Sequence, residues 1–109
     1  MVSISAHPTS RQYLPPQTPE ASPNQHILPL TATVNDRDCL EVGGCDVTAL
    51  VQQFGSPLYI LDERSVRAAC QQYRDGWQKH YPGESLVIYA SKAWSCLAIC
   101  AIASSEGLG

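Results

Sequence analysis

The clearest pattern along the chain is the helical spacing of its apolar side chains. Over positions 47–54, apolar residues recur at i, i+3, i+4 and i+7, which is typical of an amphipathic helix. Asp46 directly precedes this stretch and suits a helix N-cap, and Gly55 follows it and suits a C-terminal cap. We therefore expect a short helix between these two residues.

A longer amphipathic helix is expected after Asp62, which can cap it. Its apolar positions continue the same spacing to i+11 and are Val66, Ala69, Cys70, Tyr73 and Trp77. The polar positions between them are expected to face water, and they are Arg67, Gln71, Arg74 and Gln78. The sequence 81–83, Tyr-Pro-Gly, should end this helix, because proline cannot continue it.

Strand-like patterns lie on both sides of these helices. Residues 30–34 alternate apolar and polar positions before a polar cluster at 35–38, and 40–42 follow it, so we expect two short strands around a turn. Two compact apolar runs, 58–61 and 86–90, have the composition of buried strands. Because the second is apolar on both faces, it favours a parallel sheet covered by helices.

The last part of the chain is helical in composition over 95–106 and closes at Gly107. This helix is apolar nearly all round and therefore needs partners on several sides, which we expect to lie beyond Gly109. The order strand, helix, strand, helix over 58–109 is typical of the opening of a parallel α/β fold. Residues 31–57 form a lead-in segment, and residues 1–30, rich in Pro, Ser, Thr and Gln, are expected to be a disordered tail.

Composition excludes several classes of function. With 109 residues and a net charge of −3, the chain allows one ordinary domain, and it lacks the basic cluster that nucleic acid or an anionic membrane requires. The longest apolar run, 96–103, is far short of the roughly 20 residues that cross a bilayer. The N-terminus has no targeting pattern, so we expect a cytoplasmic protein.

The cysteines favour neither a disulfide framework nor a metal site. Their number is 5, an odd count in a chain without an export signal, so reduced thiols are expected. Cys96 and Cys100 are spaced to share one face of a helix, but they supply only two ligands, and no histidine stands at a finger-like distance from them. No metal is predicted.

Lys92 is the candidate for chemistry. It follows the apolar run 86–90, and if extended geometry continues, its side chain shares a face with Leu86, Ile88 and Ala90. In an α/β barrel, that position brings the ammonium to the mouth, where catalytic residues gather. A lysine at a strand end more often simply reaches solvent, so the pattern alone leaves both readings open.

Four segments in order resemble one enzyme family. Residues 89–93, Tyr-Ala-Ser-Lys-Ala, are similar to the lysine motif of the pyridoxal-phosphate-dependent decarboxylases of diaminopimelate, ornithine and arginine, which share the alanine-racemase type of barrel. Residues 40–44, 54–62 and 106–109 are similar to segments of the diaminopimelate decarboxylases. The ornithine enzymes usually carry Cys after the lysine, where this chain has Ala93.

The resemblance implies that Lys92 is both the catalytic and the cofactor-binding residue, attached to pyridoxal 5'-phosphate. It further implies that 58–109 begin a PLP-binding TIM (β/α)8 barrel, that the full protein is a homodimer, and that the reaction converts meso-2,6-diaminopimelate to L-lysine and CO2. The family's phosphate-binding loop and its partner for the pyridine nitrogen would lie beyond Gly109, so the chain alone is expected to be inactive. Alternatives are a non-catalytic truncated product or interaction fragment, and a related decarboxylase acting on ornithine or arginine.

Overall fold

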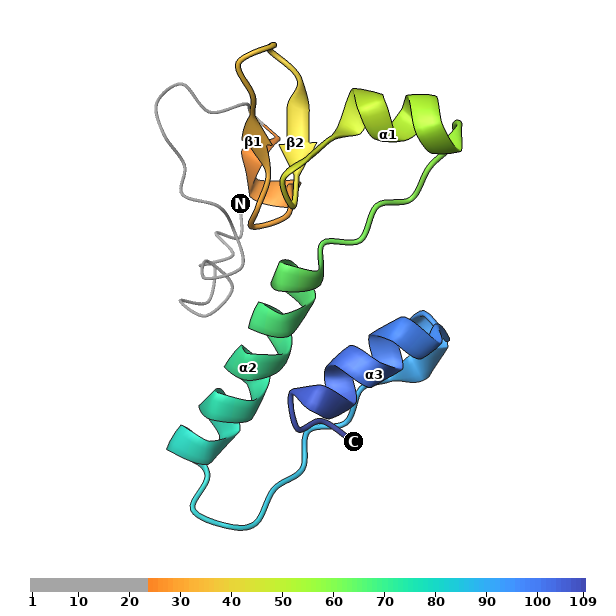
Figure 1. The fold of residues 1–109 in the computed structure, drawn as a ribbon. Coiled ribbons are helices and arrows are strands. Elements are labelled where there is room, and N and C mark those ends of the chain that lie inside the picture. Colours follow the sequence, from red (N-terminus) through yellow and green to blue (C-terminus); the bar gives the residue numbers. More distant parts are fainter. Residues whose placement is uncertain (1–23) are drawn as a thin grey trace, which may run out of the picture. The chain divides into compact units, whose positions relative to one another are not determined.

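A computed structural model describes residues 24–109 of the chain, which divide into two compact units at the junction of Asp62 and Glu63 (Figure 1). Most of the predicted tail, residues 1–23, lies outside the described residues. The first unit contains a short 3-10 helix η2 (Gln25–Ile27), a small sheet and helix α1. The second contains α2, a 3-10 helix η3 and α3. In the described part of the chain, no helix is long and apolar enough to cross a membrane.

The sheet of the first unit has three antiparallel strands in the order β1-β2-β3. Figure 1 labels β1 and β2. β1 (Thr33–Val34) pairs with β2 (Leu40–Val42), which confirms the expected pair of short strands around a turn. β3 (Cys45–Asp46) pairs with β2 on its other side and was not expected from the sequence. The observed sheet is thus antiparallel and belongs to the lead-in segment.

Turn chemistry explains both hairpins. Between β1 and β2, the backbone N–H of Asp38 donates to the carbonyl of Asn35 at 2.9 Å, and Asp38 itself has φ 58°, as in a three-residue hairpin loop. Between β2 and β3, Gly43 and Gly44 have φ values of 60° and 79°. A two-residue turn with both φ values positive matches the twist of the strands, so Gly-Gly was the signal for β3.

Helix α1 (Val47–Phe54) begins and ends where the capping residues predicted. The Asp46 carboxylate accepts hydrogen bonds from the backbone N–H groups of Thr48 and Ala49, and Gly55, with φ 86°, follows the last turn. α1 contacts β2 and β3, yet none of its residues is buried. Among the described residues of this unit, the buried apolar side chains are Ala32 and Val42.

In the second unit, α2 (Glu63–His80) and α3 (Leu97–Ser105) contact each other, and both helices lie close to their predicted bounds. The buried apolar side chains between them are Cys70, Ile99 and Ala103. The predicted apolar face of α2 is buried only in part, because Tyr73 and Trp77 remain 60% and 51% exposed.

The end of α3 folds into a Schellman motif. Gly107, with φ 86°, donates its N–H to the carbonyl of Ser104, and Leu108 donates to that of Ala103, both at 3.0 Å. These two bonds satisfy carbonyls that the helix leaves without partners, and the positive φ suits glycine. The prediction that the helix closes at Gly107 is confirmed.

Beyond this cap, Gly109 pairs with the segment that precedes Lys92. Its N–H donates to the carbonyl of Val87 at 2.9 Å, and its carbonyl accepts from the N–H of Tyr89 at 2.8 Å. Two bonds that reach residues on either side of Ile88 form the pattern of a parallel bridge. With α3 between the two paired segments, this is the hydrogen-bond arrangement of a strand–helix–strand unit.

Two predicted strands do not form as expected. Residues 58–61 are irregular, and Tyr59 is 90% exposed. Residues 86–90 are not assigned as a strand either, and Leu86 and Ile88 are 66% and 69% exposed. A strand needs a neighbour for its backbone groups, and within residues 24–109 the first run has no such neighbour while the second has only Gly109. A barrel is not seen in the described residues.

Candidate functional site

Lys92 is the middle residue of η3 (Ser91–Ala93), a single 3-10 turn directly after the paired segment 87–89. The turn is closed by a hydrogen bond from the N–H of Ala93 to the carbonyl of Ala90 at 3.0 Å. A second bond spans it, because the Tyr89 hydroxyl donates to the carbonyl of Trp94 at 3.1 Å. Lys92 therefore projects from a short loop that is fastened at both ends.

This geometry corrects the expected strand register at Lys92. The extended conformation ends at Ala90, and the 3-10 turn rotates the following residues. Lys92 therefore does not continue the face shared by Leu86, Ile88 and Ala90, because period-2 alternation holds only in extended backbone. The lysine still lies two residues after the end of the apolar run, as the sequence indicated.

The Lys92 side chain is exposed, and its ammonium makes no hydrogen bond or ion pair with any residue in the range 24–109. The Lys92 amine can therefore be reached from solution without displacing a partner among these residues. No described side chain forms a hydrogen bond or an ion pair with Lys92 Nζ.

A hollow of about 290 Å³ lies beside the lysine segment. It is lined by Tyr89, Ser91, Cys100, Ala103, Ser104, Leu108 and Gly109. Lys92 is not among these residues, so within residues 24–109 the hollow and the lysine do not form one site. Cys96 and Cys100, the candidate metal pair, are both half-buried, and the described residues contain no group of three metal-ligating side chains.

A polar cluster around Glu106 was missed at the level of sequence. The Glu106 carboxylate is only 11% exposed and accepts hydrogen bonds from Arg67 Nη1 at 2.8 Å and Gln71 Nε2 at 2.9 Å. Arg74 Nη1 donates to the Glu106 backbone carbonyl at 2.9 Å. Gln71 is exposed, as expected, whereas Arg67 and Arg74 are half-buried, because both turn toward the end of α3.

The cluster is electrostatically matched. Hydrogen bonds from Arg67 and then Gln71 hold the pKa of Glu106 below its ordinary value, and the same contact raises the pKa of Arg67. Arg67 and Arg74 also place positive charge at the C-terminal end of α3, where the helix dipole is negative, which is a favourable interaction. The available signal was the spacing of the three α2 residues, which recur at i, i+4 and i+7 on one face.

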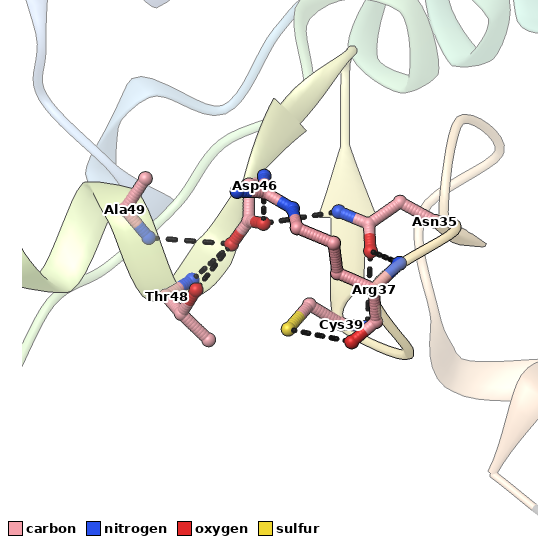
Figure 2. A network of polar contacts seen from close by, with 6 residues as sticks. All are labelled: Asn35, Arg37, Cys39, Asp46, Thr48 and Ala49. Atoms are coloured by element: carbon pink, nitrogen blue, oxygen red, sulfur yellow. Dashed lines mark hydrogen bonds and ion pairs between the residues drawn. The ribbon is translucent and has the colours of Figure 1, made fainter.

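A second network surrounds Asp46 in the first unit (Figure 2). Besides capping α1, its carboxylate accepts hydrogen bonds from Asn35 Nδ2 at 3.0 Å and Arg37 Nη2 at 2.7 Å. The side-chain hydrogen bond from Thr48, followed by that from Asn35, lowers the pKa of Asp46 to about 2. The network ties the hairpin loop to the start of α1 and has a structural role.

Comparison with known proteins gives matches to diaminopimelate decarboxylases. No protein-family model matches the chain, and no solved structure matches it significantly. A diaminopimelate decarboxylase of Synechocystis sp. is 63% identical over 102 residues, which make up 94% of this chain and 22% of that protein. Diaminopimelate decarboxylases of Bacillus methanolicus and Methanothermobacter thermautotrophicus are each 36% identical over 72% and 70% of this chain, and both matches cover 18% of the relative.

The extent of the first match bears on the candidate lysine. A stretch of 102 residues within a chain of 109 must contain Lys92, as well as the Glu41 and Asp46 region of the small sheet. The chain spans about a fifth of the length of the curated relatives that it matches. The chain is therefore related to the diaminopimelate decarboxylases over that fifth of their length.

Proposed function

We propose that the native protein, meaning the full polypeptide of which this sequence forms all or part, is a pyridoxal-phosphate-dependent carboxy-lyase. Its reaction is the removal of CO2 from meso-2,6-diaminopimelate to give L-lysine. The observation that carries this proposal is the 63% identity to a diaminopimelate decarboxylase over a stretch that includes Lys92 and its motif. A cytoplasmic homodimer is the form expected from the family.

Lys92 has the central role in this proposal. Its Nζ would hold pyridoxal phosphate covalently at the aldehyde carbon of the cofactor, and would give up that carbon to the incoming amino acid. When bound, the cofactor supplies an electron sink for the pair of electrons left by the departing carboxylate.

The lysine loop suits this task for two reasons. Its ends are fastened by the Ala93–Ala90 and Tyr89–Trp94 hydrogen bonds, which limit the positions that Nζ can reach. The side chain itself is free of ion pairs within the described residues, so no partner must be displaced before it reacts.

We further propose that residues 58–109 open a (β/α)8 barrel. The parallel bridge between Ile88 and Gly109, with α3 as the crossover, supports this arrangement, because neighbouring barrel strands are parallel and joined by a helix. The exposed apolar side chains of Leu86 and Ile88 are then surfaces that further strands and helices cover. Residues 31–57 lead into the barrel.

The test uses the native protein and a panel of three amino acids. Release of CO2 from meso-diaminopimelate, and not from ornithine or arginine, is expected, and Lys92→Ala should abolish it. Lys79→Ala is the matched control, because Lys79 is the other lysine in this sequence and is exposed at the end of α2. Preference for ornithine or arginine would replace the substrate assignment.

A separate measurement decides between an enzyme and a non-catalytic fragment. An antibody raised against residues 38–80 should detect a native polypeptide several times heavier than 11.8 kDa. A native species near that mass would leave Lys92 without the rest of an active site, and the interaction-fragment alternative would take its place.

A further inference from the structure

The Glu106 cluster is built into the turn that follows α3. Glu106 is the C-cap residue of α3, and both its carboxylate and its backbone carbonyl are held by side chains of α2. Ser105 adds to the same junction, since its hydroxyl accepts a hydrogen bond from Arg67 Nη1 at 2.9 Å. The last turn of α3 is therefore fixed to α2 at several adjacent points.

Three residues after Glu106, the chain forms hydrogen bonds with the segment that precedes Lys92. After Glu106, Gly107 and Leu108 complete the Schellman motif, and Gly109 forms the parallel bridge around Ile88. Glu106 and Gly109 are therefore the two ends of a short turn that is closed by its own hydrogen bonds.

The bridge reaches the lysine loop through Tyr89. The Tyr89 backbone N–H donates to Gly109, and its hydroxyl donates to the carbonyl of Trp94, on the far side of Lys92. Tyr89 therefore joins the bridge and the lysine loop in one residue. A shift of Gly109 would move the anchor of that loop.

We propose that Glu106 is a positioning residue for Lys92. Held by Arg67, Gln71 and Arg74, it fixes the 107–109 turn against which residues 87–89 pair, and the paired segment in turn fixes the lysine loop. The structural coupling stands on the contacts above, whereas its importance for the chemistry of Lys92 rests on the proposed function.

The alternative is that the cluster only stabilises the packing of α2 against α3. The two ideas differ in which backbone amides they affect. A packing role alters α2 and α3 as a whole, while a positioning role acts on the amides of Tyr89 and Gly109, which lie outside both helices.

The experiment is hydrogen–deuterium exchange on the native protein with its cofactor bound. Glu106→Ala and Glu106→Gln are expected to raise the exchange rates of the Tyr89 and Gly109 amides roughly tenfold, because local opening frees both bonds. Amides in the middle of α2 should change far less, and Glu106→Asp should restore part of the protection.

The matched control is Glu63→Gln. Glu63 also pairs with Arg67, with a separation of 2.7 Å, but its side chain is 62% exposed and lies far from the turn in sequence. Its removal should leave the Tyr89 and Gly109 amides unchanged. If Glu106→Ala fails to fold, Glu106→Gln and Gln71→Ala provide the same comparison.

Unchanged exchange at Tyr89 and Gly109 in the Glu106 variants would overturn the proposal, and so would an equal increase throughout α2 and α3. The visible absorbance of the bound cofactor gives the second readout. We expect the Glu106 variants to shift or weaken this band while Glu63→Gln leaves it unchanged. Altered exchange with an unaltered band would reject the link to Lys92, and failure of the proposed function itself would show as persistence of the band in Lys92→Ala.

Discussion

Gly107 provides the sharpest test of the geometry at the end of α3. Its φ of 86° lies in the left-handed region, where a residue with a Cβ is strained. A side chain at this position causes no steric clash, because a Cβ added there would be 3.7 Å from Arg74 Cδ, an ordinary van der Waals distance. The cost of Gly107→Ala is therefore conformational, about 1–2 kcal/mol.

Gly76 is a matched position at which the same substitution should have the opposite effect. It lies inside α2, and a Cβ added there would meet no atom within 4 Å. Alanine is favoured over glycine in a helix interior by about 1 kcal/mol, since it loses less backbone entropy on folding. Gly76→Ala should therefore stabilise α2 locally.

Hydrogen exchange of the native protein measures both effects. Gly107→Ala should accelerate exchange of the Gly107 and Leu108 amides by about 5–30-fold, the factor that corresponds to 1–2 kcal/mol. Gly76→Ala should slow exchange near its own position by about fivefold. Equal or slower exchange at 107–108 in Gly107→Ala would refute the left-handed conformation and, with it, the Schellman motif.

Three further predictions concern a carboxylate, a core residue and the thiols. The folded state lowers the pKa of Asp46 to about 2, so the stability that its carboxylate gives to the start of α1 should be complete above the unfolded pKa and be lost as the pH falls through about 2. A carboxylate-detected NMR titration would measure this pKa, and a midpoint near 4 would contradict the prediction. Ile99 is 5% exposed, so Ile99→Ala should lower the free energy of unfolding by about 2–5 kcal/mol and Ile99→Val by only about 0.5–1.5 kcal/mol. Urea unfolding measures both values, and equal losses would argue against the burial of Ile99. Cys70, buried and with its pKa raised by that burial, should be alkylated more slowly than exposed Cys45, and the reverse order in peptide mapping would reject this environment.

The features that could be predicted from sequence are those determined by local chemistry. Asp46, Gly55 and Gly107 mark helix ends because a capping oxygen or a positive φ acts within a few residues. The helix after Asp62 also formed as its spacing indicated. Such signals do not depend on the rest of the fold.

The predictions that failed depend on partners distant in sequence. The apolar runs 58–61 and 86–90 have strand composition, but a strand forms only where another backbone supplies hydrogen bonds. The Glu106 cluster was missed for a similar reason. Arg67 and Arg74 look like solvent-facing residues until the end of α3 is known to lie against them.

Lys92 shows what could be predicted from sequence and what could not. Its motif and its place after an apolar run are visible in the sequence, whereas the 3-10 turn that carries it depends on the hydrogen bonds of Ala90 and Tyr89. The residue type could be identified from sequence, and its orientation could not. Its attachment to a cofactor stays a prediction.

The most direct test of the central claim is reductive trapping in the native protein. Borohydride reduction with pyridoxal phosphate bound, followed by peptide mass mapping, should place a stable pyridoxyl adduct on Lys92 and none on Lys79. An adduct on Lys79 or on another residue, with Lys92 unmodified, would contradict the assignment of Lys92 as the cofactor-binding residue.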